Sequence, residues 1–558
     1  MIGAHKEVLK DFFKPQMPLG DIAALEAAGE ESRKIFSSYF DAENEPYREL
    51  RRDPSMIIGR KGSGKTDALL SYRFAAGRHT ARYEPVVFFE ANGAAGVISA
   101  VVNQIGDIVE GNRPPPTVEA VSEFWTNLFW VCLVAKVVST DRPWPKQEYE
   151  VLKRFTGSMF EAHELDEDPH RLIISTITKL RKDYALSDYK QASINFFSAH
   201  DQMPYGGITI RDAVVAAQSL LRKAKNPAII LFDSIEALDI AEVENKLVLS
   251  GLLKAVGAFQ SLSKVAHFRC CVPAETYFSL LDLSSNVLKD FRDNHILHWH
   301  SSELLRICAK RYATFLEIYA PESLGEYVKP YNGFSDRSDV IRFWENLLPA
   351  TVPNTKVDVR ESTIPYITRH TQLLPRHFLL IFNRIISSAI QEGKSLSPSR
   401  ISEEMVQESV ARMESRIVDQ VLDSYKRSWP SAKQALTAVL PGLNKNIVHY
   451  SELHKHFNQA GGERGVFQNI SGFSDFLKML SELGAIGRLT TSTNDYATAT
   501  FEYGEPHRML YTDKDTLCVH PIFTEMFRVI VPSSLPETYQ PVYPLGTDPA
   551  SADYRERW

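Results

Sequence analysis

The stretch Met56–Leu70, MIIGRKGSGKTDALL, contains the pattern G-x-x-x-x-G-K-T. Its glycines permit a tight backbone path that turns successive N–H groups toward bound phosphates. Lys65 can reach the terminal two phosphates of a nucleotide, and the Thr66 hydroxyl can bind Mg2+. The pattern therefore predicts a phosphate-binding loop for ATP and Mg2+, formed by Gly59, Arg60, Lys61, Gly62, Ser63, Gly64, Lys65 and Thr66.

The segments on either side of the loop support this prediction. Residues 55–58 (SMII) are typical of a buried strand, and residues 67–74 (DALLSYRF) continue as a helix. The N-terminus of such a helix carries a partial positive charge that favours a bound anion. The alternative, a glycine-rich turn between core elements, leaves the Lys-Thr pair unexplained.

Three further apolar runs predict a parallel sheet. They are residues 85–90 (PVVFFE), 227–232 (PAIILF) and 266–272 (AHFRCCV), and helix-like sequence lies between them. Continuous apolar runs are typical of strands buried on both faces. We expect the loop at the carboxyl edge of this sheet, because ligands of open α/β sheets bind there.

Acidic residues near the ends of these runs are candidates for catalysis. Asp233 follows the second run directly, at the position where a carboxylate of P-loop NTPases holds Mg2+, directly or through water. Glu236 is the candidate for orienting the attacking water, although it can equally cap the next helix. Glu275 can sense the terminal phosphate or lie solvated in a loop. The predicted catalytic residues are Lys65, Asp233 and Glu236, and the predicted metal ligands are Thr66 and Asp233.

Arg376 lies in the first turn of a helix predicted to begin at Pro375, within LLPRHFLLIFN (373–383). A cation at this position is unfavourable for the helix dipole. We expect an anion to compensate, either the nucleotide or a neighbouring Asp or Glu side chain.

The last part of the chain has the pattern of a winged helix. Helical patterns at 431–440, 451–458 and 473–483 precede two strand-like segments, 487–491 and 497–503. Such modules often place a helix in the DNA major groove. Residues 421–558 hold 13 Lys or Arg against 15 Asp or Glu, so the basic surface of a DNA reader is missing. The sequence leaves nucleic acid open as a partner, but charge favours a protein contact.

Composition bounds the class of protein. A chain of 558 residues is long enough for two to four domains, and its net charge of -6 provides no basic field for nucleic acid or membrane. The five cysteines show no zinc or C-x-x-C spacing, and His163, His449 and His520 have no matching metal-ligand spacing. The N-terminus lacks the apolar segment of a signal peptide, and the apolar helix at 121–138 is too interrupted for a membrane span. We expect a cytoplasmic protein with no membrane partner.

These patterns predict an α/β fold with a parallel-sheet P-loop NTPase core and added helical domains. The expected domains are an N-terminal helical brace on the nucleotide domain (1–50), the core (51–300) with a helical insertion at about 111–224, a helical lid (301–420), a winged helix (421–530) and an extended tail (531–558).

Four segments in this order resemble bacterial P-loop ATPases of the STAND and KAP type, relatives of AAA+ and origin-recognition ATPases. They are GRKGSGKT, AIILFDSIEAL, the helix at 299–311 and LLPRHFLLIFN. The resemblance implies Lys65 and Thr66 on phosphate and Mg2+, Asp233 on the metal, Glu236 at a second acidic position and Arg376 as a sensor-like arginine. Ser234 and Leu374 depart from the family's pattern. It also implies a ligand-gated switch in bacterial stress or antiphage defence.

The sequence leaves three functions open. The first is a regulatory ATPase that acts with a separate effector protein or as a homo-oligomer. The second is a DNA-binding initiator or loader, and the third is a scaffold subunit that binds nucleotide without turnover. Duplex-DNA binding with a steep salt dependence would favour the second.

Overall fold

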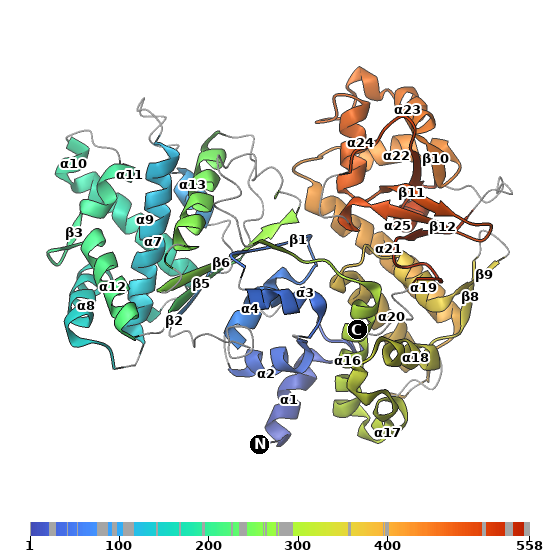
Figure 1. Ribbon diagram of the computed structural model, residues 1–558, viewed down its shortest axis with the longest axis horizontal. Coiled ribbons are helices and arrows are strands. Elements are labelled where there is room, and N and C mark those ends of the chain that lie inside the picture. The colour runs from blue at the N-terminus through green and yellow to red at the C-terminus, as the bar shows by residue number, and fades with distance from the viewer. Residues whose placement is uncertain are drawn as a thin grey trace. The chain divides into compact units, whose positions relative to one another are not determined.

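The computed structural model is a mixed α/β structure (Figure 1). The residues that it describes exclude 1, 22–29, 42, 53, 75–86, 92–96, 104–115, 141–142, 167–168, 192–195, 225–226, 234–242, 261, 263–264, 275–276, 278–293, 355–358, 394, 397–400, 505–508, 530–539 and 552–558.

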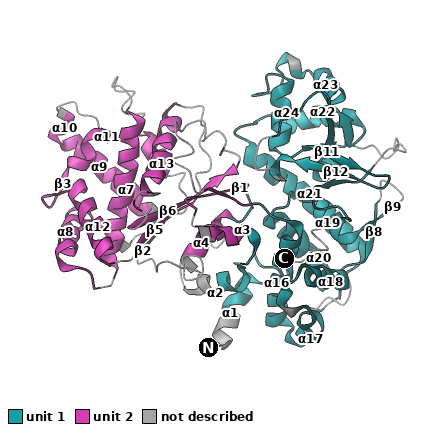
Figure 2. Ribbon diagram, in the orientation of Figure 1, with its two compact units in different colours: residues 1–46, 60–64, 298–558 teal, residues 47–59, 65–297 magenta. Residues whose placement is uncertain are grey.

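The chain divides into two compact units (Figure 2). Unit 1 comprises residues 1–46, 60–64 and 298–558, and unit 2 comprises residues 47–59 and 65–297. The five residues 60–64 of the predicted phosphate loop therefore belong to unit 1, whereas both flanking segments belong to unit 2.

Unit 2 contains a parallel sheet. Among the described residues its strands are ordered β2-β5-β6-β1-β7, and every neighbouring pair is parallel. The predicted parallel sheet is thus confirmed. The strands are β1 (Met56–Gly59), β2 (Val87–Ala91), β5 (Ala228–Phe232), β6 (Ala266–Pro273) and β7 (Asn294–Ile296).

The strand that leads into the loop lies inside the sheet. Residues of β1 pair with β6 on one side (Ile57 with Cys271) and with β7 on the other (Ile57 with His295). All four residues of β1 are buried, as the apolar sequence predicts. A strand held by two ladders gives the loop that follows it a rigid base.

The other elements of unit 2 are mainly helices. They are α4 (Lys65–Phe74), α7 (Val118–Ser139), α8 (Lys146–Met159), α9 (Pro169–Leu186), α10 (Asp188–Gln191), α11 (Phe196–Ala199), α12 (Ile210–Ala224), α13 (Val243–Gln260) and the short strands β3 (Pro204–Tyr205) and β4 (Ile208–Thr209). Helix α3 (Glu45–Arg48) contains the junction at residues 46 and 47.

Helix α7, the first of the expected insertion, packs directly on the sheet. The Phe129 ring meets Phe232 and Phe268 edge-on, with centroids 5.4 and 4.9 Å apart. Trp125 Nε1 donates to the Val248 carbonyl of α13 at 3.2 Å. Of the described helices, α7 alone is long and apolar enough to cross a membrane, and 72% of its most apolar window is buried inside the protein. Its apolar sequence therefore builds the core of unit 2.

Unit 1 combines helices with a second sheet. Its helices are α1 (Ile2–Phe12), α2 (Glu30–Tyr39), α16 (Ser301–Tyr319), α17 (Leu324–Tyr327), α18 (Arg337–Leu347), α19 (Thr363–Arg369), α20 (Pro375–Gly393), α21 (Glu403–Tyr425), α22 (Ala432–Val439), α23 (Tyr450–Gln459), α24 (Phe473–Glu482) and α25 (Pro521–Met526). Its strands are β8 (Thr351–Asn354), β9 (Val359–Ser362), β10 (Ile447–His449), β11 (Ile486–Ser492), β12 (Ala497–Phe501), β13 (Thr516–Val519) and β14 (Val542–Pro544).

The N-terminal segment packs on α16 and α20 of unit 1. Arg311 Nη1 donates to the Leu19 carbonyl at 3.1 Å, and Asn383 Oδ1 accepts from the Leu19 N–H at 2.7 Å. Asp41 forms ion pairs with Arg306 and Lys310 at 3.2 and 2.7 Å. Residues 1–46 belong to unit 1, as these contacts with α16 and α20 reflect. The expected brace on the nucleotide domain stays a prediction.

The predicted helices and strands between residues 431 and 503 are all present, as α22, α23, α24, β11 and β12. The two strands β11 and β12 belong to a larger sheet with the strand order β10-β13-β11-β12-β14. Its last pair, β12 with β14, is parallel, and the other pairs are antiparallel. The tail thus contributes a strand to this sheet.

Candidate functional site

The loop segment after β1 has the backbone that its glycines predict. Gly62 and Gly64 have φ values of 90° and 86°. Side chains with a Cβ rarely adopt this left-handed region, so both positions favour glycine. The Ser63 N–H donates to the Arg60 carbonyl at 3.0 Å, which closes a tight turn, and α4 begins directly at Lys65.

Three predicted site residues of unit 2 lie at the carboxyl ends of β1 and β5. Lys65 is 7% exposed, and its Nζ donates to the Gly59 carbonyl at 2.8 Å. The Thr66 hydroxyl donates to Asp233 Oδ2 at 2.7 Å, and Asp233 is 5% exposed. The sheet therefore brings a hydroxyl and a carboxylate 167 residues apart into direct contact.

This pair fits a hard divalent cation. Mg2+ prefers oxygen ligands and usually takes only one or two from protein side chains, with water and phosphate completing the octahedron. The Thr66 hydroxyl and the Asp233 carboxylate are the side chains of unit 2 that would hold it. A bound cation would compensate the charge of the buried carboxylate, because burying a charge without a partner is unfavourable in free energy.

Residues 60–64 are anchored to unit 1 through their carbonyl groups. Trp299 Nε1 donates to the Ser63 carbonyl at 2.8 Å. The Arg376 N–H, one of the first four N–H groups of α20, donates to the Gly62 carbonyl at 3.3 Å. A Cβ built on Gly62 would lie 2.9 Å from Arg376 Cβ, so the arginine side chain lies directly against the loop. The structure thus places the predicted Arg376 beside Gly62.

The Arg60 side chain contacts the C-terminal ends of α21 and α24 and a residue that follows β12. Its Nη2 donates to the Glu482 carbonyl at 3.3 Å, and its guanidinium lies over the rings of Tyr425 and Tyr503, with Cζ 5.9 and 5.5 Å from their centroids. Lys61 is exposed. The sequence predicts both residues as part of the phosphate loop, and no sequence pattern predicts these partners of Arg60.

Two buried histidines lie near this arginine. Burial, with the charges of Arg60 and Arg376, lowers the pKa of His377 to about 3. Burial and neighbouring charges also lower the pKa of His520 well below its ordinary value. Both rings are therefore neutral at pH 7, and His377 Nδ1 accepts the Gln372 N–H at 3.2 Å. Neutral rings add no further positive charge beside Arg60 and Arg376.

Glu236, the predicted second carboxylate, and Glu275, the predicted phosphate sensor, lie outside the described residues. Within the described part of the chain, no group of three or more His, Cys, Asp or Glu side chains could hold a metal ion. His520 donates to or accepts from Tyr503 at 2.8 Å, and His449 caps α23.

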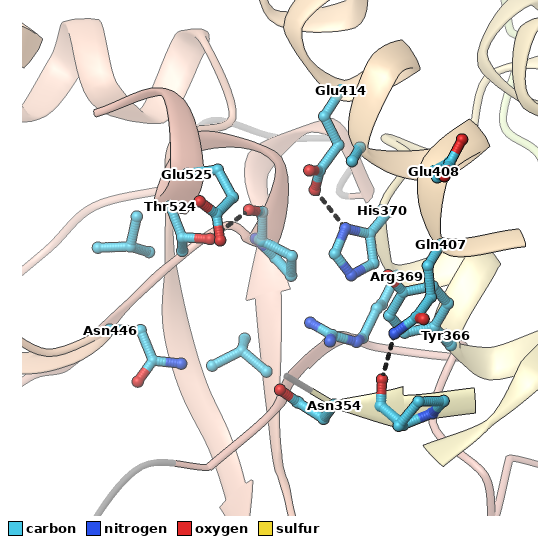
Figure 3. Close-up of a pocket in the computed structure, with 15 residues that line it drawn as sticks. Asn354, Tyr366, Arg369, His370, Gln407, Glu408, Glu414, Asn446, Thr524 and Glu525 are labelled. Carbon is cyan, nitrogen blue, oxygen red and sulfur yellow. Dashed lines mark hydrogen bonds and ion pairs between the residues drawn. The ribbon is translucent and has the colours of Figure 1, made fainter. Parts of the chain in front are cut away.

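Unit 1 also contains a pocket of about 300 Å³ (Figure 3). Its buried lining includes Arg369, the last residue of α19, His370, which follows it, and Glu414 of α21. Glu408 and Glu525 also line the pocket and are exposed. His370 and Glu414 bond to each other. A cavity of this volume is at the lower end of the range for small-molecule sites.

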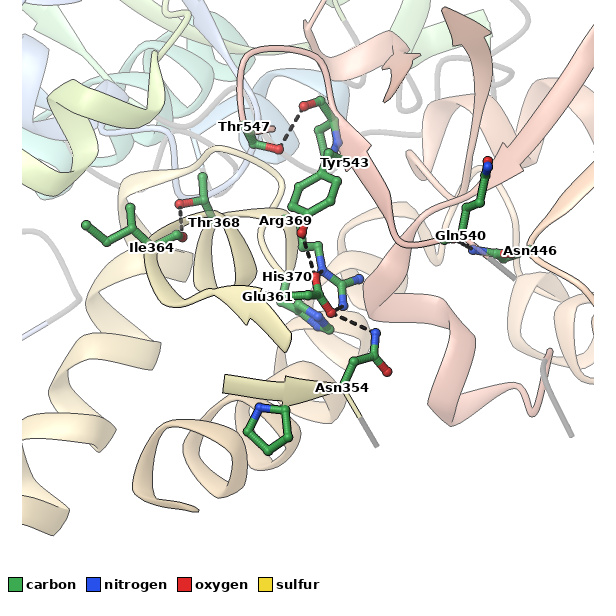
Figure 4. A network of polar contacts seen from close by, with 12 residues as sticks. Asn354, Glu361, Ile364, Thr368, Arg369, His370, Asn446, Gln540, Tyr543 and Thr547 are labelled. Carbon is green, nitrogen blue, oxygen red and sulfur yellow. Dashed lines mark hydrogen bonds and ion pairs between the residues drawn. The ribbon is translucent and has the colours of Figure 1, made fainter. Parts of the chain in front are cut away.

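A network of polar contacts shares Asn354 and Arg369 with the lining of this pocket (Figure 4). Glu361 of β9 accepts hydrogen bonds from Arg369 Nε and Nη2, each at 2.8 Å. Asn354 of β8 donates to it at 2.7 Å, and the Tyr543 hydroxyl of β14 donates at 2.6 Å. Burial opposes the charged form, but Arg369 and these donors hold the pKa of Glu361 below its ordinary value. The carboxylate therefore joins three separate segments of unit 1.

No protein-family model matches this chain, and no curated protein is significantly similar to it. The geometry of the loop segment and of the Thr66–Asp233 pair is therefore the basis on which a function is inferred.

Proposed function

We propose that this protein is an ATP-binding regulatory switch that hydrolyses ATP in the presence of Mg2+. In this proposal residues 51–300 are a P-loop NTPase core, and residues 421–530 are a winged-helix module that contacts a partner protein. The partner is a separate effector or a second copy of the chain, in a cytoplasmic stress or defence system of the kind that the family resemblance implies.

The observation that carries the proposal is the 2.7 Å contact of Thr66 Oγ1 with Asp233 Oδ2. The G-x-x-x-x-G-K-T motif predicts the Thr66 hydroxyl as a metal ligand, and the apolar run before residue 233 predicts the Asp233 carboxylate as another. Neither pattern requires that the two side chains be in contact. Their contact beside Lys65 supports a common role in binding a magnesium-associated triphosphate.

Different groups of the chain would bind different parts of the magnesium–nucleotide complex. The Lys65 ammonium, now on the Gly59 carbonyl, would transfer to phosphate oxygens, a stronger charge-assisted bond. Gly62 and Ser63 have their carbonyls fixed by Arg376 and Trp299, so the loop backbone needs little reorganisation on binding. Mg2+ held by Thr66 and Asp233 would neutralise charge on the phosphates.

Titration with a fluorescent ATP analogue in the presence of Mg2+ tests the proposal. We expect Lys65→Ala to abolish binding, because it removes the ammonium that the phosphates require. Lys61→Ala is the matched control, since it removes an exposed side chain of the same loop and keeps the loop's backbone N–H groups, so it should retain binding. Wild-type affinity in the Lys65 variant would contradict the proposal.

Turnover is tested separately with Glu236→Gln. We expect this variant to retain ATP binding and to lose hydrolysis. Unchanged hydrolysis would transfer the role of Glu236 to another residue, and absence of hydrolysis in the wild type would identify a nucleotide-binding scaffold. Salt-sensitive binding of duplex DNA would replace the protein-contacting role with the DNA-binding one.

A further inference from the structure

The C-terminal end of helix α24 presents two carbonyl groups, those of Glu482 and Leu483, to side-chain donors. The Leu480 and Ser481 carbonyls accept from the Ala485 and Gly484 N–H groups, each at 2.8 Å. The Glu482 and Leu483 carbonyls follow, at the negative end of the helix dipole. Arg60 Nη2 lies 3.3 Å from the Glu482 oxygen and 3.5 Å from the Leu483 oxygen, so this loop residue caps α24.

A second donor caps the same end without involving the loop. Gln372 Nε2 donates to the Leu483 carbonyl at 2.8 Å. Gly484, with φ of 64°, makes the close approach possible, because a Cβ there would lie 2.8 Å from Gln372 Nε2 and 2.7 Å from Tyr503 Cδ1. The end of α24 is therefore shaped to receive both side chains.

The backbone of Arg60 is joined to the Gly59 carbonyl, the group that a phosphate would replace as the hydrogen-bond acceptor of Lys65. Lys65 Nζ donates to the Gly59 carbonyl, which belongs to the peptide bond joining Gly59 to Arg60. Transfer of that ammonium to a phosphate releases this peptide. Gly62 and Ser63 remain fixed through their carbonyls, so a change in the loop is concentrated at residues 59–60.

We propose that Arg60 is the positioning residue through which ATP at the loop changes the C-terminal end of α24 and the strand β11 that follows it. The inference rests on the proposed ATP-binding function and adds its regulation: occupancy of the loop alters how Arg60 caps α24, and the surface of residues 473–503 changes as a result. Coupling of this kind needs a contact that differs between the two states, and the Arg60 cap is such a contact.

Hydrogen exchange of the full chain, with and without ATP and Mg2+, tests the inference. In the wild type we expect ATP to change the exchange rates of residues 473–503. In Arg60→Ala we expect this ATP-dependent difference to be lost, with each variant compared at a saturating ATP concentration set by its own measured Kd. Arg60→Lys retains the charge but not the planar fork, and should restore only part of the difference.

Gln372→Ala is the control for a purely structural role. It removes the other donor at the same helix end, so exchange in α24 should rise with and without ATP, while the ATP-dependent difference persists. Loss of the difference in this variant as well, or its persistence in Arg60→Ala, would overturn the inference. Failure of the wild type to bind ATP would instead overturn the proposed function, so the two failures are distinguishable.

Discussion

Thr66 and Asp233 show how much a single contact depends on the surrounding fold. Each residue belongs to its own local sequence pattern. Thr66 follows Lys65 after a glycine-rich turn, and Asp233 follows the apolar run that ends at Phe232. The β6 strand separates their parent strands β1 and β5 in the sheet. The side chains still meet, because parallel strands end at the same edge and α4 begins there.

Glu361 provides a prediction at the residue scale. Glu361→Gln keeps the shape of the side chain but leaves the buried Arg369 without its counter-charge. Removal of one partner from a buried pair typically costs about 3–5 kcal/mol. We expect a loss of this size in the free energy of unfolding measured with urea, whereas Glu322→Gln, at an exposed position, should change it by less than about 0.5 kcal/mol.

The Glu361 carboxylate also makes the difference in unfolding free energy between the wild type and Glu361→Gln depend on pH. The pKa of Glu361 is lower in the folded protein than in the unfolded chain, where it is about 4.3. Its contribution is therefore fully present above that unfolded value and is lost as pH falls through the folded pKa. The stability gap between wild type and Glu361→Gln should narrow below about pH 4; a constant gap from pH 7 to pH 3 would contradict the assigned pairing.

At the scale of elements, the close packing of α7 on α13 depends on Gly251. A Cβ at this position would lie 2.5 Å from Val121 Cγ1 and 3.1 Å from the Ser122 nitrogen. Gly251→Ala must therefore displace the Val121 side chain or move the two helices apart, and overpacking of this kind costs about 1–3 kcal/mol. We expect a loss of that size in the free energy of unfolding.

The matched control for this substitution is Gly157→Ala in α8. Nothing lies within 4 Å of a Cβ built at Gly157, so the added methyl meets open space. Alanine is favoured over glycine inside a helix by roughly 0.5–1 kcal/mol. We expect this variant to be at least as stable as the wild type; equal destabilisation of both variants would exclude close packing as the cause.

The elements differ in how well the sequence predicts them. Long apolar runs and helical periodicities gave β1, β5, β6, α7, α20 and α24 correctly. Strands β7 and β14 were not predicted, because NHI and VYP are only three residues long and lack a local pattern. Their pairing is set by neighbours distant in sequence, β1 and β12.

The candidate site follows the same rule. Lys65, Thr66 and Asp233 could be predicted because each belongs to a local motif. The role of Arg60 could not, because its partners Glu482 and Leu483 are more than 400 residues away and contribute only backbone carbonyls, which carry no sequence signal.

At the scale of the whole molecule, ligand binding should raise stability. A ligand that binds only the folded protein stabilises it by about 2.7 kcal/mol when present at 100 times its Kd. We expect ATP with Mg2+ to shift the urea unfolding transition of the wild type accordingly, and Lys65→Ala to show no shift. An equal shift in both proteins would indicate that ATP binds elsewhere.

The path of the chain through its two units limits how the protein can be dissected. It leaves unit 2 after Gly59, contributes five residues to unit 1 and returns at Lys65. A fragment that starts at residue 298 would lack the carbonyls that Trp299 and Arg376 bind, and a fragment of residues 47–297 would carry those five residues without their partners. Truncation is therefore a poor way to assign activities, and point substitutions in the intact polypeptide are the appropriate tools.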